Sequence, residues 1–122
     1  MNNPVGWFEI YVKDMTRAKA FYTAVFNAHF THIASANMEL FAFGMDQTSY
    51  GTTGALVYMP GFTAGSNSVL VYFRCEDCNN EIQKSIVAGG RIQKQKTPIG
   101  PNGHIALIID TEGNMIGLHS MH

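Results

Sequence analysis

The stretch that decides the fold is WFEIYVKDMTRAKAFYTAVFNA, residues 7–28. Its first part alternates between apolar residues in one phase (Phe8, Ile10, Val12) and aromatic or charged residues in the other (Trp7, Glu9, Tyr11). A period of two predicts a β-strand whose two faces meet different surroundings. From Met15 onward the apolar residues recur every three or four positions, which predicts a helix that Asp14 or Thr16 can cap.

The same order of elements starts again 63 residues later, with Asp77 in the place of Asp14. SVLVYFRCED (residues 68–77) predicts a strand that ends in an acidic corner, and CNNEIQKSIVAGG (residues 78–90) predicts a helix. The apolar stripe of this second helix consists of Cys78, Ile82 and Ile86. Extended segments are predicted after the two helices at residues 29–35, 38–44, 53–59, 91–96, 104–109 and 114–120.

Each half of the chain therefore has the order strand, helix, strand, strand, strand. The Gly-, Ser- and Pro-containing segment PGFTAGSNS, residues 60–68, is expected to link them. We predict a single α+β domain over residues 1–122, with one module at about 5–60 and a second at about 69–122. The two βαβββ modules are expected to form a curved mixed sheet around a central cavity, with the helices on the convex side.

The alternation also predicts which side chains face this cavity. The phase of Phe8, Ile10 and Val12 is uniformly apolar and suits the helix-packed side, so the opposite phase is left for the cavity. The 63-residue repeat gives the equivalent positions in the second module, and the last strand adds the residues that alternate with its apolar ones. The full predicted lining is Trp7, Glu9, Tyr11, Leu70, Tyr72, Arg74, Met115, Gly117 and His119. Because Gly117 contributes no side chain, the sequence leaves a gap in this lining.

The composition restricts the partners. The net charge of −1 and the lack of a basic run argue against nucleic acid, and the longest apolar runs are too short to span a membrane. The first ten residues lack the features of a signal peptide, so a cytoplasmic location is expected. With 46% hydrophobic and 14% charged residues, the chain is expected to bury apolar surface in a homodimer.

Two segments, FEIYVKDMTRAKAFYTAVFNA and HIALIIDTEGNMIGLHS, resemble the vicinal oxygen chelate (VOC) superfamily, which includes glyoxalase I, bleomycin-resistance proteins and extradiol dioxygenases. The combination of WFEIYV with GNxIGLHS is similar to a glyoxalase-like subgroup. The resemblance implies a divalent metal held by His and Glu residues from four strands. In this sequence those positions fall on Trp7, Leu70, Gly117 and the segment 54–58, none of which offers an imidazole or carboxylate.

We therefore expect no metal or other cofactor at the usual place, and a cavity that binds a small, partly apolar molecule. One alternative is a shifted metal site in which Glu9, His104 and His119 form a 2-His-1-carboxylate set of a lyase or isomerase. Arg74 argues against that alternative, because an ion pair between Arg74 and Glu9 would engage the carboxylate without a metal. The other alternative is metal-free acid–base catalysis, with Glu9 as base and His119 or Tyr72 as acid.

Two further motifs have simpler interpretations. Cys75 and Cys78 have the spacing of a redox pair or of half a zinc site, but no second such pair or HxxxH motif follows. We interpret them as small, half-buried residues at a strand-to-helix corner, and the sequence leaves a redox role open. His29 and His32 are three residues apart on a strand, so they point to opposite faces and are expected at the surface.

Overall fold

The computed structural model describes residues 5–44, 46, 48 and 51–122, and it has two modules of the same order. The elements of the first are β1 (Glu9–Tyr11), α1 (Met15–Phe26), β2 (Phe30–Ile33), β3 (Glu39–Phe43) and β4 (Ala55–Tyr58). Those of the second are β5 (Tyr72–Arg74), α2 (Cys78–Val87), β6 (Arg91–Pro98), a 3₁₀ turn at Gly100–Asn102, β7 (His104–Ile109) and β8 (Met115–Ser120). The predicted order is confirmed, although β1 and β5 are shorter than the segments that the alternation marks.

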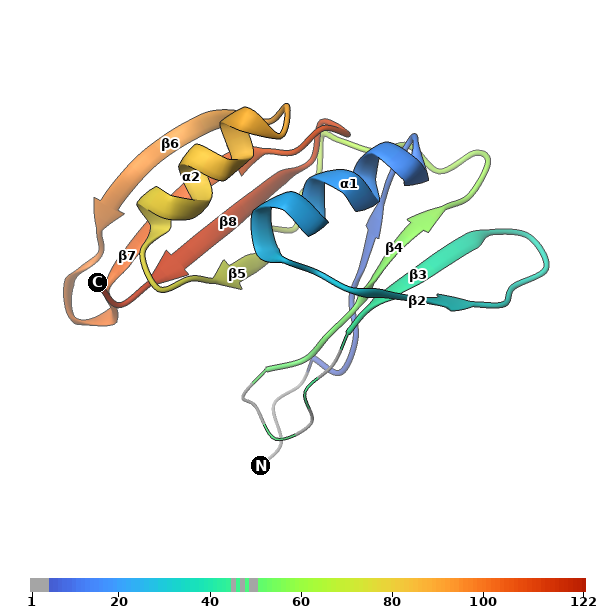
Figure 1. Ribbon diagram of the computed structural model, residues 1–122, viewed down its shortest axis with the longest axis horizontal. Coiled ribbons are helices and arrows are strands. Elements are labelled where there is room, and N and C mark those ends of the chain that lie inside the picture. The colour runs from blue at the N-terminus through green and yellow to red at the C-terminus, as the bar shows by residue number, and fades with distance from the viewer. Residues whose placement is uncertain (1–4, 45, 47, 49–50) are drawn as a thin grey trace.

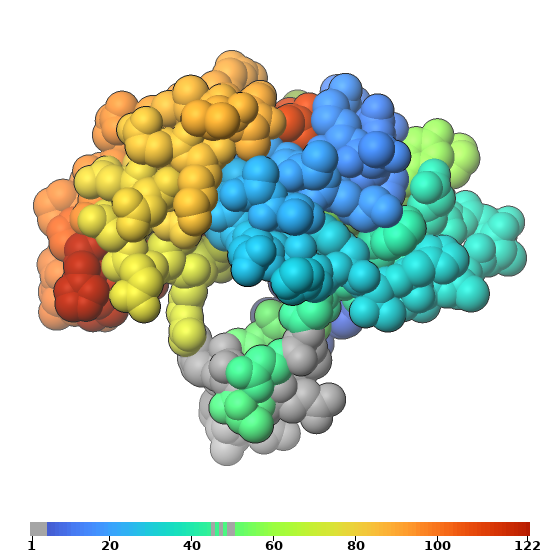
Figure 2. Space-filling view, viewed as in Figure 1, coloured from blue at the N-terminus to red at the C-terminus, as the bar shows by residue number. Residues whose placement is uncertain are grey.

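Each module forms a four-stranded mixed sheet. The strand orders are β1-β4-β3-β2 and β5-β8-β7-β6, with the first strand of each module parallel to the last and the remaining pairs antiparallel. Both helices lie next to each other on one side of the two sheets (Figures 1 and 2). The α+β fold of two βαβββ modules is therefore confirmed.

The helices begin where the sequence places their acidic corners. Asp14 accepts a hydrogen bond from the backbone N–H of Arg17 at 3.0 Å, and Asp77 accepts one from Asn79 at 2.9 Å. Each carboxylate thus satisfies an amide that the first helical turn leaves without a partner. At the end of α1, Asn27 takes a left-handed conformation with φ of 53°, one that asparagine tolerates better than most residues.

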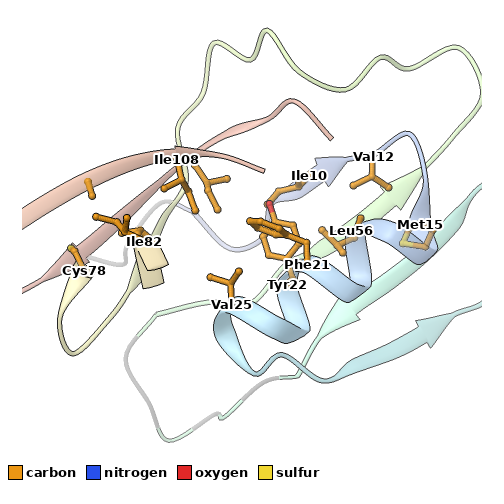
Figure 3. Close-up of a cluster of buried hydrophobic side chains, with 14 residues drawn as sticks. Ile10, Val12, Met15, Phe21, Tyr22, Val25, Leu56, Cys78, Ile82 and Ile108 are labelled. Carbon is orange, nitrogen blue, oxygen red and sulfur yellow. The ribbon is translucent and has the colours of Figure 1, made fainter. Parts of the chain in front are cut away.

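One hydrophobic core joins the two modules. Ile10 on β1 and Val12 just after it are buried, as the strand pattern predicts, and they pack in the same cluster as Ile82 from α2 and Ile108 from β7 (Figure 3). The stripe predicted for α2 is wrong at one position, because Ile86 is 45% exposed and Ser85 is fully buried instead. At 3.6 residues per turn, the eighth residue after Cys78 lies about 80° around the helix from it, whereas the seventh nearly eclipses it.

A buried carboxylate ties the second module to the start of α1. Glu112, in the turn DTEGN (residues 110–114), accepts hydrogen bonds from the backbone N–H groups of Lys13 and Asp14, both at 2.8 Å. It also pairs with Arg17 at 2.6 Å and accepts the hydroxyl of Thr111. Burial alone would raise the pKa of Glu112, but the hydrogen bonds, led by that from Arg17, outweigh burial and lower it.

Two other side chains of the DTEGN turn reach into the first module. Asp110 accepts the phenol of the buried Tyr22 at 2.7 Å, and Asn114 donates to the backbone carbonyl of Tyr11 at 2.9 Å. Burial raises the pKa of Asp110, and burial followed by the charge of Asp110 raises that of Tyr22. The turn therefore joins the modules through buried polar contacts.

Candidate functional site

The candidate site is a hollow between β1, the segment that links β4 to β5, and the start of β8. Its volume is about 400 Å³. It is lined by Phe8, Glu9, Ile10, Tyr11, Thr63, Gly65, Ser66, Asn67, Ser68, Val69, Val71, Asn114, Met115 and Ile116. The linking segment passes from the first sheet to the second beside β8, so both modules contribute to this hollow (Figure 1).

The structure brings together part of the predicted lining. Glu9, Tyr11 and Met115 line the hollow, and Trp7 adjoins it through a hydrogen bond to Glu9. Leu70, Tyr72, Arg74, Gly117 and His119 do not line it. They lie along β5 and β8 or just before β5, and near β5 the hollow is lined by Val69 and Val71 instead.

Glu9 is held by its two neighbours on the same strand face. The indole Nε1 of Trp7 donates to one carboxylate oxygen at 3.3 Å, and the hydroxyl of Tyr11 donates to the other at 2.9 Å. Burial, followed by the hydrogen bond to Glu9 and its charge, raises the pKa of Tyr11. The phenol therefore stays protonated and donating. The contact of Glu9 with Arg74 stays a prediction.

The gap predicted at Gly117 is filled by a ring. Gly117 pairs with Tyr72 across β8 and β5, and a Cβ atom placed on Gly117 would overlap the Tyr72 ring. Tyr72 itself is 46% exposed. This position, one of those where the resemblance implies a metal ligand, is therefore occupied by the edge of a phenol ring.

The proposed shifted metal site is not assembled in this chain. In the β7–β8 register His104 pairs with Ser120, whereas His119 pairs with Ile105. Because neighbouring residues on a strand point to opposite faces, the two imidazoles lie on opposite sides of the sheet, and the expected juxtaposition is wrong. Within the described residues no group of three or more His, Cys, Asp or Glu side chains is placed to hold a metal ion.

The individual histidines have other surroundings. His119 Nε2 lies 2.6 Å from the backbone oxygen of Asn102, at the far end of the second sheet from the hollow. His104 Nδ1 is buried on the helix side without a hydrogen-bond partner among the described residues. His32 on β2, the outer strand of the first sheet, and His29 just before that strand are both exposed, as predicted.

The cysteines are both free thiols, with Cys75 half-buried and Cys78 fully buried. Burial, followed by the negative charge of Glu81, raises the pKa of Cys75 to about 12. A thiol of that kind is a poor nucleophile at neutral pH. The interpretation as small residues at a strand-to-helix corner matches these surroundings, but the half-burial expected for both is found for Cys75 and is wrong for Cys78.

Sequence reasoning missed two asparagines that build the wall of the hollow. Asn67 donates to the backbone oxygens of Val69 and Met115 and accepts the N–H of Met115, while Asn114 accepts the N–H of Gly65 at 2.7 Å. These contacts fix the linking segment to β8. The signal was present in the DTEGN turn for Asn114, but Asn67 lies in a stretch whose composition indicates only a flexible linker.

Comparison with known families places the chain. The model of the Glyoxalase/Bleomycin resistance protein/Dioxygenase superfamily matches residues 5–118. The chain belongs to this superfamily. The superfamily's metal-binding positions do not fit a metal here, because indole, aliphatic side chains and a glycine covered by Tyr72 offer no suitable donor.

Solved structures show the same superfamily fold. A mutant of maize (Zea mays) glyoxalase I is 21% identical with a TM-score of 0.77, covering 97% of this chain and 46% of the maize chain. A glyoxalase/bleomycin resistance protein/dioxygenase family enzyme from Burkholderia phytofirmans is 17% identical (TM-score 0.66, 96% and 98% covered). A fosfomycin resistance protein from Listeria monocytogenes is 15% identical (TM-score 0.67, 98% and 92% covered).

This chain thus spans about half the length of the maize enzyme, and at these identities the likeness shows the fold alone. No curated protein matches the chain. Within the described residues, none of the helices has the length and apolar character needed to cross a membrane.

Proposed function

We propose that this superfamily member binds a small, partly apolar molecule in the hollow beside β1, without a metal at the superfamily's usual positions. The supporting observation is the hollow itself, about 400 Å³ in volume and walled by both modules and the linking segment. Its apolar residues from β1, β8 and the approach to β5 are combined with a few neutral polar groups and one carboxylate, that of Glu9. This is the composition of a small-molecule site.

A homodimer is part of the proposal. Several large apolar side chains around β1 and β5 are exposed in the single chain: Trp7 at 45%, Phe62 at 55%, Val69 at 71% and Tyr72 at 46%. A second copy that covers them would also close the hollow from outside. A cytoplasmic location is proposed as well, and two free thiols agree with a reducing compartment.

The proposal is tested by ligand occupancy. Protein purified without a metal-affinity tag is analysed by native mass spectrometry for a co-purified organic molecule and by ligand-observed NMR against a fragment library. Val69→Trp narrows the hollow, and Val87→Trp, on an exposed face of α2, is the matched control.

We expect Val69→Trp to weaken binding at least tenfold and Val87→Trp to leave it unchanged. Equal binding by wild type and Val69→Trp, or no binding of any fragment, would overturn the proposal. Sedimentation equilibrium on the same samples tests the homodimer.

A further inference from the structure

The charge inside the hollow has one sign. Of the described residues that line it, Glu9 is the one with a formally charged side chain. The others are apolar residues, serine, threonine, asparagine, glycine and the protonated Tyr11. Among the described residues, a ligand in the hollow therefore meets a negative charge and no cationic side chain, which disfavours an anion and favours a positive group.

The carboxylate is oriented without being neutralised by the groups that hold it. Trp7 and Tyr11 donate one hydrogen bond to each oxygen, and both donors are uncharged. An ionised carboxylate has about four acceptor sites, so both oxygens keep capacity for a further donor. Glu9 is thus positioned from both sides, and its carboxylate has acceptor sites left for a ligand.

Aromatic rings lie beside this carboxylate. Tyr11 stacks on Phe62 with ring centroids 5.2 Å apart and an interplanar angle of 19°. Phe62 and Trp7 are each about half exposed. The faces of such rings attract cations and also pack against the apolar part of an organic molecule.

We infer that the ligand of this hollow is a small organic cation, whose ammonium group pairs with Glu9 while its apolar body packs against the rings of Trp7 and Tyr11 and against Val69. This inference rests on the proposed function, because it names the class of molecule that the same hollow takes. It requires no chemical step, only a charge-assisted hydrogen bond and apolar contact.

The test uses three probes of similar size that differ in charge: phenethylamine, phenethyl alcohol and 3-phenylpropionate. Their affinities are measured by isothermal titration calorimetry, and the fluorescence of Trp7, the single tryptophan of the chain, reports binding beside Glu9. We expect the amine to bind at least tenfold more tightly than the alcohol, and the carboxylate to bind most weakly.

Glu9→Gln keeps the size of the exposed side chain and removes its charge, so it is expected to fold normally. It should weaken the amine at least tenfold and leave the alcohol unchanged. Glu39→Gln, at an exposed position of β3 outside the hollow, is the matched control and should change neither affinity.

The outcomes separate the two proposals. Equal or tighter binding of the alcohol or the carboxylate in wild type, or an unchanged amine affinity in Glu9→Gln, overturns the cation inference while the hollow remains a binding site. Failure of all three probes overturns the inference, and failure of the fragment library as well overturns the proposed function.

Discussion

Removing the carboxylate of Glu112 should destabilise the fold more than any surface change. Its Oε1 accepts the backbone N–H groups of Lys13 and Asp14 and one N–H of Arg17, while Oε2 accepts the Arg17 Nε and the Thr111 hydroxyl. Glu112→Ala leaves all of these donors without their acceptor. Each unsatisfied buried donor costs about 1–3 kcal/mol, and loss of one partner of a buried pair costs about 3–5 kcal/mol.

For Glu112→Ala we expect the free energy of unfolding to fall by about 3–5 kcal/mol, which is less than the sum over the separate contacts. The reason is that the Arg17 side chain is 49% exposed and can hydrogen-bond to water instead. Glu112→Gln replaces one acceptor by a donor that faces other donors, and should cost about 2–3 kcal/mol. Arg17→Ala leaves the two amides on the carboxylate, and should cost about 1–2 kcal/mol.

The assay is urea unfolding followed by circular dichroism at pH 7, at one fixed protein concentration because dimerisation would shift apparent stability. Exposed Glu76→Ala is the control for loss of a glutamate and should stay within about 0.5 kcal/mol of wild type. A Glu112→Ala protein within about 1 kcal/mol of wild type would refute the reasoning.

The same variants test the pH dependence. The pKa of Glu112 is lowered in the folded state, so its stabilisation is complete above the pKa of an unfolded glutamate and is lost as the pH falls through the folded value. Between pH 7 and pH 3, Glu112→Gln should therefore lose less stability than wild type. Asp110 has the opposite effect. Because its pKa is raised in the folded state, Asp110 favours folding more at low pH than at neutral pH.

Three further outcomes are expected. Tyr22→Phe removes the buried hydrogen bond to Asp110 and should lower the free energy of unfolding by about 1–3 kcal/mol in denaturant titrations. Gly54→Ala drives a methyl group into the backbone just before β1 and should lower the free energy of unfolding by about 2–3 kcal/mol. In Gly117→Ala the nearest atoms belong to the half-exposed ring of Tyr72, which can rotate away, so the loss should stay below about 1 kcal/mol. Similar melting curves for the two variants would contradict this. Cys75, with a pKa of about 12, should resist iodoacetamide at pH 8 in the native protein and react only after denaturation, as mass spectrometry would show.

Much of the fold was predictable because its patterns are local. The alternation around Ile10 predicts the buried face of β1, and Asp14 and Asp77 mark both helix starts. The error at Ile86 came from extending a four-residue spacing beyond two turns, where 3.6 residues per turn already favours Ser85.

The candidate site was harder to predict because it depends on register and on distant contacts. Whether His104 faces His119 is decided by a one-residue offset between β7 and β8, which no local pattern reveals. The role of Glu112 was equally hidden, since a charged residue in a turn ordinarily lies in solvent and its partners are about a hundred residues away. Asn67 was hidden for the same reason, because its contacts lie on β8.

The contact between Glu112 and the start of α1 has a consequence for how the chain folds. The amide of Lys13 receives its acceptor from a residue 99 positions further along, so the first module leaves the ribosome well before that acceptor exists. Contacts of such long range form slowly, because the entropy cost of closing the intervening chain comes before any energy is gained from the contact. During synthesis the first module should therefore pass through a state in which the start of α1 lacks hydrogen-bond acceptors and an apolar sheet face is exposed. In this state the chain presents the most apolar surface for chaperones to bind.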